Sequence, residues 1–567
     1  MACHKHRISV RYIVSSKPLT APLRAKKYAH MKQKLKMIVT KDSDSVPYPS
    51  GSLTGNGNGY SFGESCANAE GDSFTSATVT NSVQIIPSSV RRTALYEKFK
   101  LKIIHNPSLN RTLVSFQANK QAPFSAWFKY REGFSERLVT YLLQNLKPQP
   151  GVLLDPFSGS GSALFAASAL GWQAQGIELL PVGSYTTQAR LVAQRINVDA
   201  FNRVVADLKQ INFADYYDQC YTLKPLAITR GAFSSVEEEQ LVGYISYCHK
   251  FVTNDDIRTL LLYAAFCILE DISYTRKDGQ YLRWDVRSGR SRGKKTFNKG
   301  EILTFYKAIH QKLKQMVSDL DVESIQLDLF CDSLSSQSAT LAPSQVKNYE
   351  PVFYQGSCLE ILPTLQESSI DFVMTSPPYL NRYDYTRTYA LELVFLRCSE
   401  EKVKQLRQEM LSCTVENRDK RHHLEQSYTG MGRQQEFLNV DSTFQKQAAL
   451  QEVLSILEAY RKEGKLNNTN IARMVRNYFY EMCFVIYELA RILQPGGIVA
   501  MVNDNVQYAG EEVPVDLILS DMAESCGLTT RHIWTLGRGK GNSSQQMGNH
   551  GRSELRKCVY IWEKPLL

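Results

Sequence analysis

The chain contains 567 residues, of which 43% are hydrophobic and 22% are charged. This length exceeds that of one ordinary domain, so we expect two folding units or one domain with large insertions. The sequence has no uninterrupted run of about 18 apolar residues, which argues against a membrane-spanning helix. The twelve cysteines are scattered singly, without a C-x-x-C pair, and favour a reducing compartment over a disulfide scaffold or a zinc ribbon.

The net charge of +11 belongs to the beginning of the chain. Residues 1–41 contain eleven Lys and Arg residues and no acidic residue, which leaves residues 42–567 formally neutral. Such a segment is typical of a nucleic-acid-binding arm, an organelle transit peptide, or translation from too early a start, with Met31 and Met37 as later starts. Because no apolar face recurs in it, we expect residues 1–90 to be a dispensable basic extension and a disordered linker.

Residues 91–200 have the pattern of a strand–helix–strand unit. A helical apolar face spans Glu132–Leu146, and Gly151–Asp155 is predicted to be a short buried strand that runs into a turn rich in glycine and serine. A helix over Ala163–Leu170 and a second strand over Gln173–Leu180 follow. This order of elements implies a parallel sheet.

Residues 201–344 are mostly helical in pattern, as in Ile257–Ile268, and are predicted to be a large insertion. The exception is Arg276–Lys299, where nine Lys and Arg residues stand against Asp278 and Asp285 and alternate with aromatic residues. This stretch is either a solvated basic loop or part of a surface that recognises nucleic acid.

The sheet pattern resumes within residues 345–567. Residues 400–470 interrupt it as a second, polar and helical insertion. A long helix is predicted to end at Leu493, and Pro495-Gly496-Gly497 is predicted to form the turn before the next strand. The predicted strands of this half are Phe353–Gln355, Ile370–Met374, Ile498–Val502, His532–Leu536 and Cys558–Trp562.

The first motif, Asp155-Pro156-Phe157-Ser158-Gly159-Ser160-Gly161, connects a predicted strand to the next helix. Glycines let the backbone turn tightly and let a ligand approach it, and nucleosides bind at this place in doubly wound folds. Glu178 ends the following strand, where an acidic side chain can bind two ribose hydroxyls. No G-x-G-x-x-G or G-K-[ST] pattern is present, which argues against a phosphate cradle. The alternative is an ordinary turn with a surface glutamate.

The second motif, Thr375-Ser376-Pro377-Pro378-Tyr379, directly follows a predicted buried strand. Its two prolines make the loop extended and rigid and leave carbonyls without local partners. Ser376 and the Pro377 carbonyl can accept hydrogen bonds from an exocyclic amine, and the ring of Tyr379 can stack on a base. The alternative is a proline-stiffened loop with a packed tyrosine.

Together the two motifs resemble those of the S-adenosylmethionine-dependent amino-methyltransferases of DNA, D-P-F-x-G-S-G and T-S-P-P-Y. Lys129–Ser135 is similar to the segment that closes over the methionine end of the cofactor, and Gln494–Gly497 matches the turn before the fifth strand. The resemblance implies an α/β fold, with a doubly wound, seven-stranded, Rossmann-like methyltransferase sheet and a large, mostly helical insertion. It makes residues 91–200 the cofactor-binding half and residues 345–567 the catalytic half.

The resemblance also implies which residues form the site. Catalysis would use Ser376, Pro377, Pro378 and Tyr379, and no metal is required. The cofactor S-adenosyl-L-methionine would contact the first motif and its neighbours, namely Phe134, Ser135, Asp155, Pro156, Phe157, Gly159, Ser160, Gly161, Glu178, Ser357, Cys358 and Thr375.

Three details qualify the resemblance. In this family a Ser before Pro-Pro goes mostly with N4-cytosine methylation, and an Asp there goes mostly with N6-adenine methylation. Gly356-Ser357-Cys358 stands where the family often has Gly-Asp, which puts a contact with the cofactor adenine in doubt. The cofactor motif also precedes T-S-P-P-Y, whereas the reverse order is commoner among proteins with these motif spellings.

The resemblance therefore predicts a site-specific methyltransferase that modifies the N4 amine of cytosine in duplex DNA. The target base would be flipped out of the stack, and the methyl group would be transferred directly, by positioning and electrostatics. The alternatives are an N6-adenine enzyme, an RNA or protein-glutamine methyltransferase, and an inactive DNA-binding protein. The implied partners are double-stranded DNA and, in a complete system, a cognate restriction endonuclease, with no membrane. The implied location is the cytoplasm, in association with the nucleoid.

Two segments are candidates for contact with DNA. Arginine bonded to guanine is the commonest specific contact in the major groove, so the arginines are predicted to read bases and the lysines to bind phosphates. The candidates within the first insertion are Arg283, Trp284, Arg287, Arg290, Arg292, Lys294 and Lys295. The competing candidates, within Gly537–Arg556, are Arg538, Lys540 and Arg552.

Overall fold

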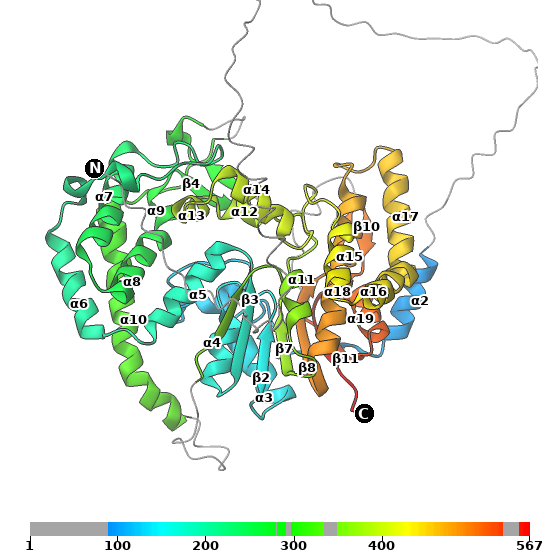
Figure 1. Ribbon diagram of the computed structural model, residues 1–567. Helices are drawn as coiled ribbons and strands as arrows, with labels where there is room; N and C mark the ends of the chain where they lie inside the picture. Colours follow the sequence, from blue (N-terminus) through cyan, green and yellow to red (C-terminus); the bar gives the residue numbers. More distant parts are fainter. Residues whose placement is uncertain (1–88, 279–280, 291–295, 334–348, 537–554, 567) are drawn as a thin grey trace, which may run out of the picture. The chain divides into compact units, whose positions relative to one another are not determined.

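A mainly parallel sheet of eight strands organises the part of the chain that the structure describes (Figure 1). The computed structural model describes residues 89–278, 281–290, 296–333, 349–536 and 555–566. The order across the sheet is β1-β11-β12-β8-β7-β2-β3-β6, and among these strands β12 runs against its two neighbours. The strands are β1 Ile103–His105, β2 Val152–Asp155, β3 Gln173–Glu178, β6 Val352–Gln355, β7 Ile370–Thr375, β8 Leu493–Asp504, β11 Thr529–Thr535 and β12 Lys557–Glu563.

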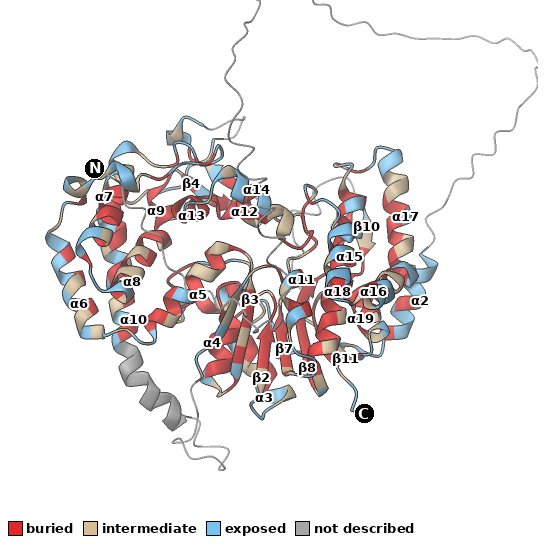
Figure 2. Ribbon diagram, in the orientation of Figure 1, coloured by how far each residue is buried: buried red, intermediate tan, exposed pale blue. Residues whose placement is uncertain are grey.

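Helices cover both faces of this sheet, and the central strands are buried as a result (Figure 2). Alternate residues of one strand point to opposite faces. In β7, Phe372 packs with α3 Glu136–Leu146 and α4 Ser162–Ala169, while its neighbour Val373 packs with α18 Ile471–Ile492 and α19 Val515–Ser525. Around α18 and α19 lie α2 Val90–Phe99, α11 Cys358–Ile361, α15 Arg421–Gly430, α16 Gln434–Lys446 and α17 Ala448–Lys462.

A second group of helices encloses a hydrophobic cluster of its own. This cluster contains many aromatic residues, and Tyr244, Tyr263 and Phe266 are fully buried in it. The antiparallel hairpin of β4 Thr275–Asp278 and β5 Tyr281–Trp284 follows these helices. The helices that contribute are α5 Pro181–Ala193, α6 Val198–Asp207, α7 Ser235–Phe251, α8 Asp255–Cys267, α9 Leu269–Ile272, α10 Phe305–Ser333, α13 Ala390–Phe395 and α14 Glu400–Glu409.

The remaining elements are short. Helix α12 Tyr385–Thr388 follows the second motif, and β9 Val506–Tyr508 pairs with β10 Glu511–Val513 in an antiparallel hairpin after β8. No helix within the described ranges has both the length and the apolar character that crossing a bilayer would require.

The expected α/β architecture with a mainly parallel sheet is confirmed, and three details differ from the sequence prediction. The sheet has eight strands rather than seven, because the short β1 pairs in parallel with β11. Helix α3 begins at Glu136 rather than Glu132, because the side chain of Ser135 accepts a hydrogen bond from the Leu138 amide and caps the helix there. Strand β8 begins at Leu493, so the proline and glycines expected in a preceding turn lie within it, beside an irregularity in its pairing with β7.

Candidate active site

The two motifs lie at the same edge of the sheet because their strands are adjacent and parallel. Strand β2 ends at Asp155, and its neighbour β7 ends at Thr375. On the other side of β2, strand β3 ends at Glu178. Ligands of open α/β sheets bind outside the carboxyl ends of the strands, which makes this edge the expected place for a site.

One side-chain hydrogen bond joins the two motifs directly. The Thr375 hydroxyl donates to Oδ1 of Asp155 at 2.8 Å, and the same oxygen accepts the Phe157 amide at 3.0 Å. Both Thr375 and Asp155 are buried. Burial raises the pKa of Asp155 to about 7, although the two hydrogen bonds oppose this shift. This buried hydrogen bond therefore connects the loops of the two motifs.

Glu178 organises the turn of the first motif. Its two carboxylate oxygens accept the Gly159 amide at 2.7 Å and the Leu180 amide at 2.6 Å. Burial raises the pKa of this carboxyl group to about 7, against the effect of these amides. Gly159 has φ of +53°, and a Cβ atom there would lie 2.8 Å from the ring of Tyr130. The turn therefore requires glycine both for its conformation and for the aromatic ring that covers it.

These loops border a cavity that encloses about 780 Å³, part of it open to solvent. Its lining includes four acidic residues, Glu132, Asp155, Glu178 and Glu409. Burial also raises the pKa of Glu132, and hydrogen bonds from tyrosine hydroxyls oppose this rise. The predicted site residues that line the cavity are Phe134, Asp155, Pro156, Phe157, Gly159, Ser160, Glu178, Ser357, Cys358, Ser376 and Pro378.

Five predicted site residues do not line the cavity. Ser135 is fully buried as the cap of α3, and its hydroxyl donates to the Leu113 carbonyl. Thr375 is buried beneath the motifs, as described above. The others are Gly161, where α4 begins, and Pro377 and Tyr379 of the second motif.

The cavity has further lining residues that the sequence did not single out as site residues. Tyr130 and Glu132 belong to the segment that resembles the cofactor-closing motif, so a local signal existed for them. Tyr385 follows the second motif, and Glu409–Leu411 come from the end of α14. No local pattern marks the α14 residues, because tertiary packing brings them to the cavity.

The second motif is internally ordered. The Ser376 hydroxyl donates to the Tyr379 hydroxyl oxygen at 3.2 Å, and the Tyr379 carbonyl accepts the Asn381 amide at 2.7 Å. Burial and the nearby Asp504 carboxylate hold the pKa of Tyr379 well above its usual value. Tyr379 is therefore a neutral, half-buried ring with its hydroxyl fixed beside Ser376.

Comparisons with known proteins show which family the chain belongs to. The chain is 44% identical to the type II methyltransferase M.AvaI of a Nostoc species over 474 residues, which are 83% of this chain and 93% of that protein. It is 37% identical to the type II methyltransferase M.BsoBI of Geobacillus stearothermophilus over 486 residues, 82% of this chain and 92% of the relative. The chain belongs to the type II DNA methyltransferase family. A more distant relative is M.MvaI of Kocuria varians, at 19% identity over 74% of this chain and 86% of its own length.

No family model matches the chain, and no solved structure matches it. Within the described ranges, no three His, Cys, Asp or Glu side chains are grouped as metal ligands would be.

For a DNA methyltransferase, the basic segment after α9 is the next region of interest. Arg283 on β5 is exposed and lies 3.1 Å from the Asp278 carboxylate and 4.3 Å from the Phe297 ring. Arg287 is bound to the buried carboxylate of Asp285 and holds the pKa of that group far below its usual value. Both arginine side chains are 45% exposed, and each is paired with an aspartate of the same segment.

The other basic residues of this segment are also engaged. The Arg290 guanidinium lies 4.3 Å from the Trp284 ring and donates to the Arg230 carbonyl at 2.8 Å. Lys277 and Lys299, expected among the solvated charges, instead have partners within the protein: the buried Lys277 ammonium group pairs with Glu392, and the half-buried Lys299 donates to the Ser273 carbonyl. The predicted DNA contacts Arg292, Lys294, Lys295, Arg538, Lys540 and Arg552 lie outside the described residues.

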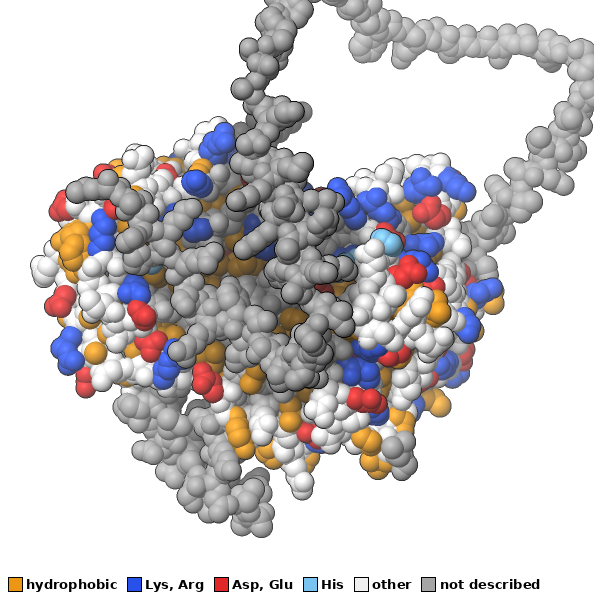
Figure 3. Space-filling model, viewed as in Figure 1, with side chains coloured by type: hydrophobic (Ala, Val, Ile, Leu, Met, Phe, Trp, Pro, Cys, Tyr) orange, Lys and Arg blue, Asp and Glu red, His pale blue; other side chains and the backbone are white. Residues whose placement is uncertain are grey.

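Lysine and arginine also occur elsewhere on the surface. On the face drawn in Figure 3 they gather beside the upper ends of α15 and α17, with acidic residues between them. Arg461, Lys462 and Lys465 at the end of α17 are exposed, but Arg461 and Lys465 are paired with neighbouring glutamates. These pairs make the α17 surface a mixed one rather than a uniformly basic one.

Proposed function

We propose that this protein transfers a methyl group from S-adenosyl-L-methionine to the N4 amine of cytosine at a specific sequence in duplex DNA. The main support is the hydrogen bond between Thr375 and Asp155, which joins the proline-rich loop to the acidic cavity at one edge of the sheet. A group held by the loop would therefore lie next to a ligand in the cavity.

The cavity residues fit the cofactor. The cavity lies at the carboxyl ends of β2, β3 and β7, where open α/β sheets bind small-molecule ligands. The cofactor has a sulfonium and an ammonium group, and carboxyl groups of the lining, such as those of Glu132, Asp155 and Glu178, would complement these positive charges. Each oxygen of Glu178 accepts one amide and retains a lone pair for a ribose hydroxyl.

The protein's contribution to the reaction is binding and orientation. The cofactor supplies an activated methyl group on sulfur. Ser376 and the Pro377 carbonyl would accept hydrogen bonds from the target amine and so direct its lone pair toward the cavity. Tyr379 would stack on the flipped base, with its hydroxyl held by Ser376. The chain has no Pro-Cys pair that could supply a cysteine nucleophile. The proposed direct transfer forms no covalent bond between the enzyme and the base.

The choice of cytosine rests on Ser376, because an Asp at this position goes mostly with adenine in the resembling family. Duplex DNA is the proposed partner, within a restriction–modification system that includes a cognate endonuclease. The proposed place of action is the nucleoid.

The test is to incubate the purified protein with plasmid DNA and isotope-labelled cofactor and to identify the methylated nucleoside by mass spectrometry. We expect N4-methylcytosine, at a position that sequencing of the product maps. N6-methyladenine would refute the choice of base. Absence of label in wild-type reactions, with cofactor binding intact, would refute the activity. The Asp155→Asn variant is the control for the cofactor site, because its amide has the same shape without the charge.

A further inference from the structure

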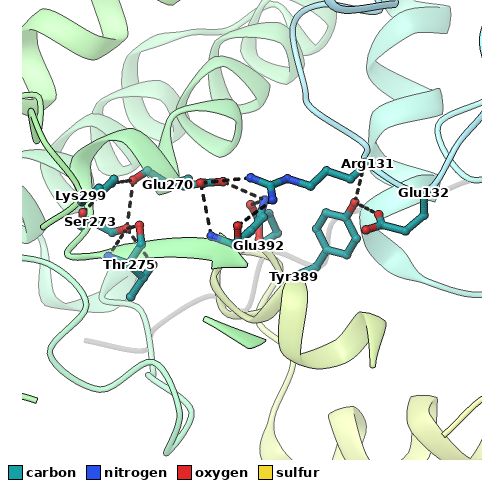
Figure 4. Close-up of polar contacts among 9 residues, drawn as sticks. Arg131, Glu132, Glu270, Ser273, Thr275, Lys299, Tyr389 and Glu392 are labelled. Carbon is teal, nitrogen blue, oxygen red and sulfur yellow. Dashed lines mark hydrogen bonds and ion pairs between the residues drawn. The ribbon is translucent and has the colours of Figure 1, made fainter. Parts of the chain in front are cut away.

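A network of buried polar contacts links the hairpin β4–β5 to the wall of the cavity (Figure 4). Its centre is Lys277 on β4, whose side chain is only 4% exposed. The ammonium group pairs with the Glu392 carboxylate of α13 at 2.5 Å, and Glu392 is 1% exposed. A buried pair such as this is costly to desolvate, and it contributes little stability beyond what an apolar pair would give. The pair instead fixes the positions of β4 and α13 relative to each other, although these elements are far apart in sequence.

The second part of the network runs from Lys277 to the cavity. The ammonium group lies 4.8 Å from the centre of the Tyr389 ring, within the range of a cation–π contact. The Tyr389 hydroxyl donates to Glu132, and the Tyr389 ring is stacked on Tyr130 with 5.3 Å between the centroids. Glu132 and Tyr130 both line the cavity, and Tyr130 covers the turn at Gly159.

Arg131 provides a second connection between the same two regions. Its guanidinium donates to the Lys277 carbonyl at 2.6 Å, and its backbone amide donates to the Tyr389 hydroxyl oxygen at 3.2 Å. Arg131 also faces Glu270, whose carboxylate accepts the Lys277 amide at 3.3 Å (Figure 4). The segment that carries Tyr130 and Glu132 is thus fixed to β4 through both backbone and side chains.

The opposite face of the same hairpin is exposed and basic. Because side chains alternate along a strand, Lys277 points inward while its neighbour Arg276 points outward. Arg276 is paired across the hairpin with Arg283, which is also exposed. Two exposed arginines side by side repel each other and suit contact with phosphates or base edges.

We propose that the buried Lys277–Glu392 pair is a positioning element that couples the cavity to the hairpin, so that filling the cavity strengthens binding of duplex DNA. The inference rests on the proposed function, because it takes the cavity as the cofactor site and the hairpin as a DNA contact. A ligand that orders Tyr130 and Glu132 would hold Tyr389, and through it Lys277 and the two arginines. The coupling is reciprocal, so bound DNA would strengthen binding of the cofactor to the same degree.

The test measures the dissociation constant of a labelled duplex that contains the mapped methylation site, without and with saturating S-adenosylhomocysteine. We expect the wild-type constant to fall by at least about fivefold when this compound is present. In the double variant Lys277→Met/Glu392→Met, which leaves no unpaired buried charge, we expect this factor to approach one while the melting temperature stays near that of wild type. The inference would be overturned if the double variant kept the wild-type ratio of dissociation constants without and with S-adenosylhomocysteine. It would also be overturned if this compound did not change the dissociation constant of the wild-type protein.

Two further variants keep the test decisive. Tyr389→Phe removes the hydroxyl that joins Glu132 to Arg131 but keeps the stacked ring, and it too should lose most of the factor even if the double variant does not fold. Lys564→Met is the matched control, because Lys564 is a half-buried lysine outside this network that donates to the Leu493 carbonyl at 2.8 Å. It should keep the factor, and loss of the factor in this control would refute a specific role for Lys277. Wild-type methylation remains the separate test of the proposed function.

Discussion

The pH dependence of cofactor binding should report the two buried carboxyl groups of the cavity. In the free protein, Asp155 and Glu178 each have a pKa of about 7, raised mainly by burial. A ligand with positive charge favours the ionised forms, so binding should lower both pKa values and release protons. Affinity for S-adenosylmethionine should therefore rise as the pH rises toward 7.5.

The magnitude follows from the fraction that is ionised. A carboxyl group with a pKa of about 7 is about 9% ionised at pH 6 and about 76% ionised at pH 7.5, so binding that requires the ionised form tightens about eightfold over this interval. If both groups must ionise, the change is larger, and the two titrate as a coupled pair because each carboxylate disfavours the other. The α-amino group of the cofactor titrates near pH 8, so the interval stays below that value.

Isothermal titration calorimetry in buffers of different ionisation enthalpy measures both the affinity and the protons released. The Glu178→Gln variant keeps an acceptor for the Gly159 amide but lacks one titrating group, so its profile should be flatter than that of wild type. A wild-type affinity that does not change between pH 6 and pH 7.5, or that weakens as the pH rises, would refute the reasoning. The folding stability of the free protein should change with pH in the opposite direction to the cofactor affinity. Because the folded-state pKa values lie above the unfolded ones, the free protein should lose stability as the pH rises from about 4 toward 7.

Four other predictions concern single residues. Ser376→Asp should slow methylation of cytosine at least tenfold. The cofactor affinity measured by calorimetry should stay within about twofold of wild type, because the residue belongs to the second motif. Loss of cofactor binding in this variant would contradict the separate roles of the two motifs. Tyr379→Ala should cost about 1–3 kcal/mol in binding of a duplex with a mismatch at the target base, and wild-type affinity would show that this ring is not the stacking surface. Gly159→Ala should weaken cofactor binding, because the new Cβ atom meets the Tyr130 ring at 2.8 Å, and an unchanged dissociation constant would show that the turn adapts. Arg283→Ala should cost about 1–3 kcal/mol on the mapped site and relax specificity at one base pair; a uniform loss on all DNA would indicate a phosphate contact instead.

The sequence predicts the sheet and its site edge well because the signals there are local. The strands β2 and β7 are short, mostly apolar runs directly followed by a motif, so Asp155 and Thr375 are found at the strand ends where the pattern puts them. The start of α3 was missed by four residues because Ser135, and not the apolar pattern, decides where the helix begins.

The features that the sequence could not predict depend on distant partners. Lys277 looks like one of many exposed charges in a basic stretch, and its burial follows from Glu392, which is 115 residues away. Met410 and Leu411 line the cavity directly after the end of α14, where the Glu409 carbonyl accepts a hydrogen bond from the Ser357 hydroxyl at 3.5 Å. In both cases the deciding contact is between segments whose proximity arises only in the folded chain.

The reversed strand β12 has a consequence for the connection between β11 and β12. Because β12 runs against β11, the chain leaves the sheet at Leu536 and returns at Lys557 on the same edge, where the Leu536 amide donates to the Lys557 carbonyl. The connection is therefore closed at its base, next to the ends of β8 and β7. The entropy of closing a loop grows only slowly with its length, so the antiparallel pairing of β11 with β12 depends little on how many residues separate the two strands. The ends of β8 and β7 are in turn separated from the connection by the paired residues at its base.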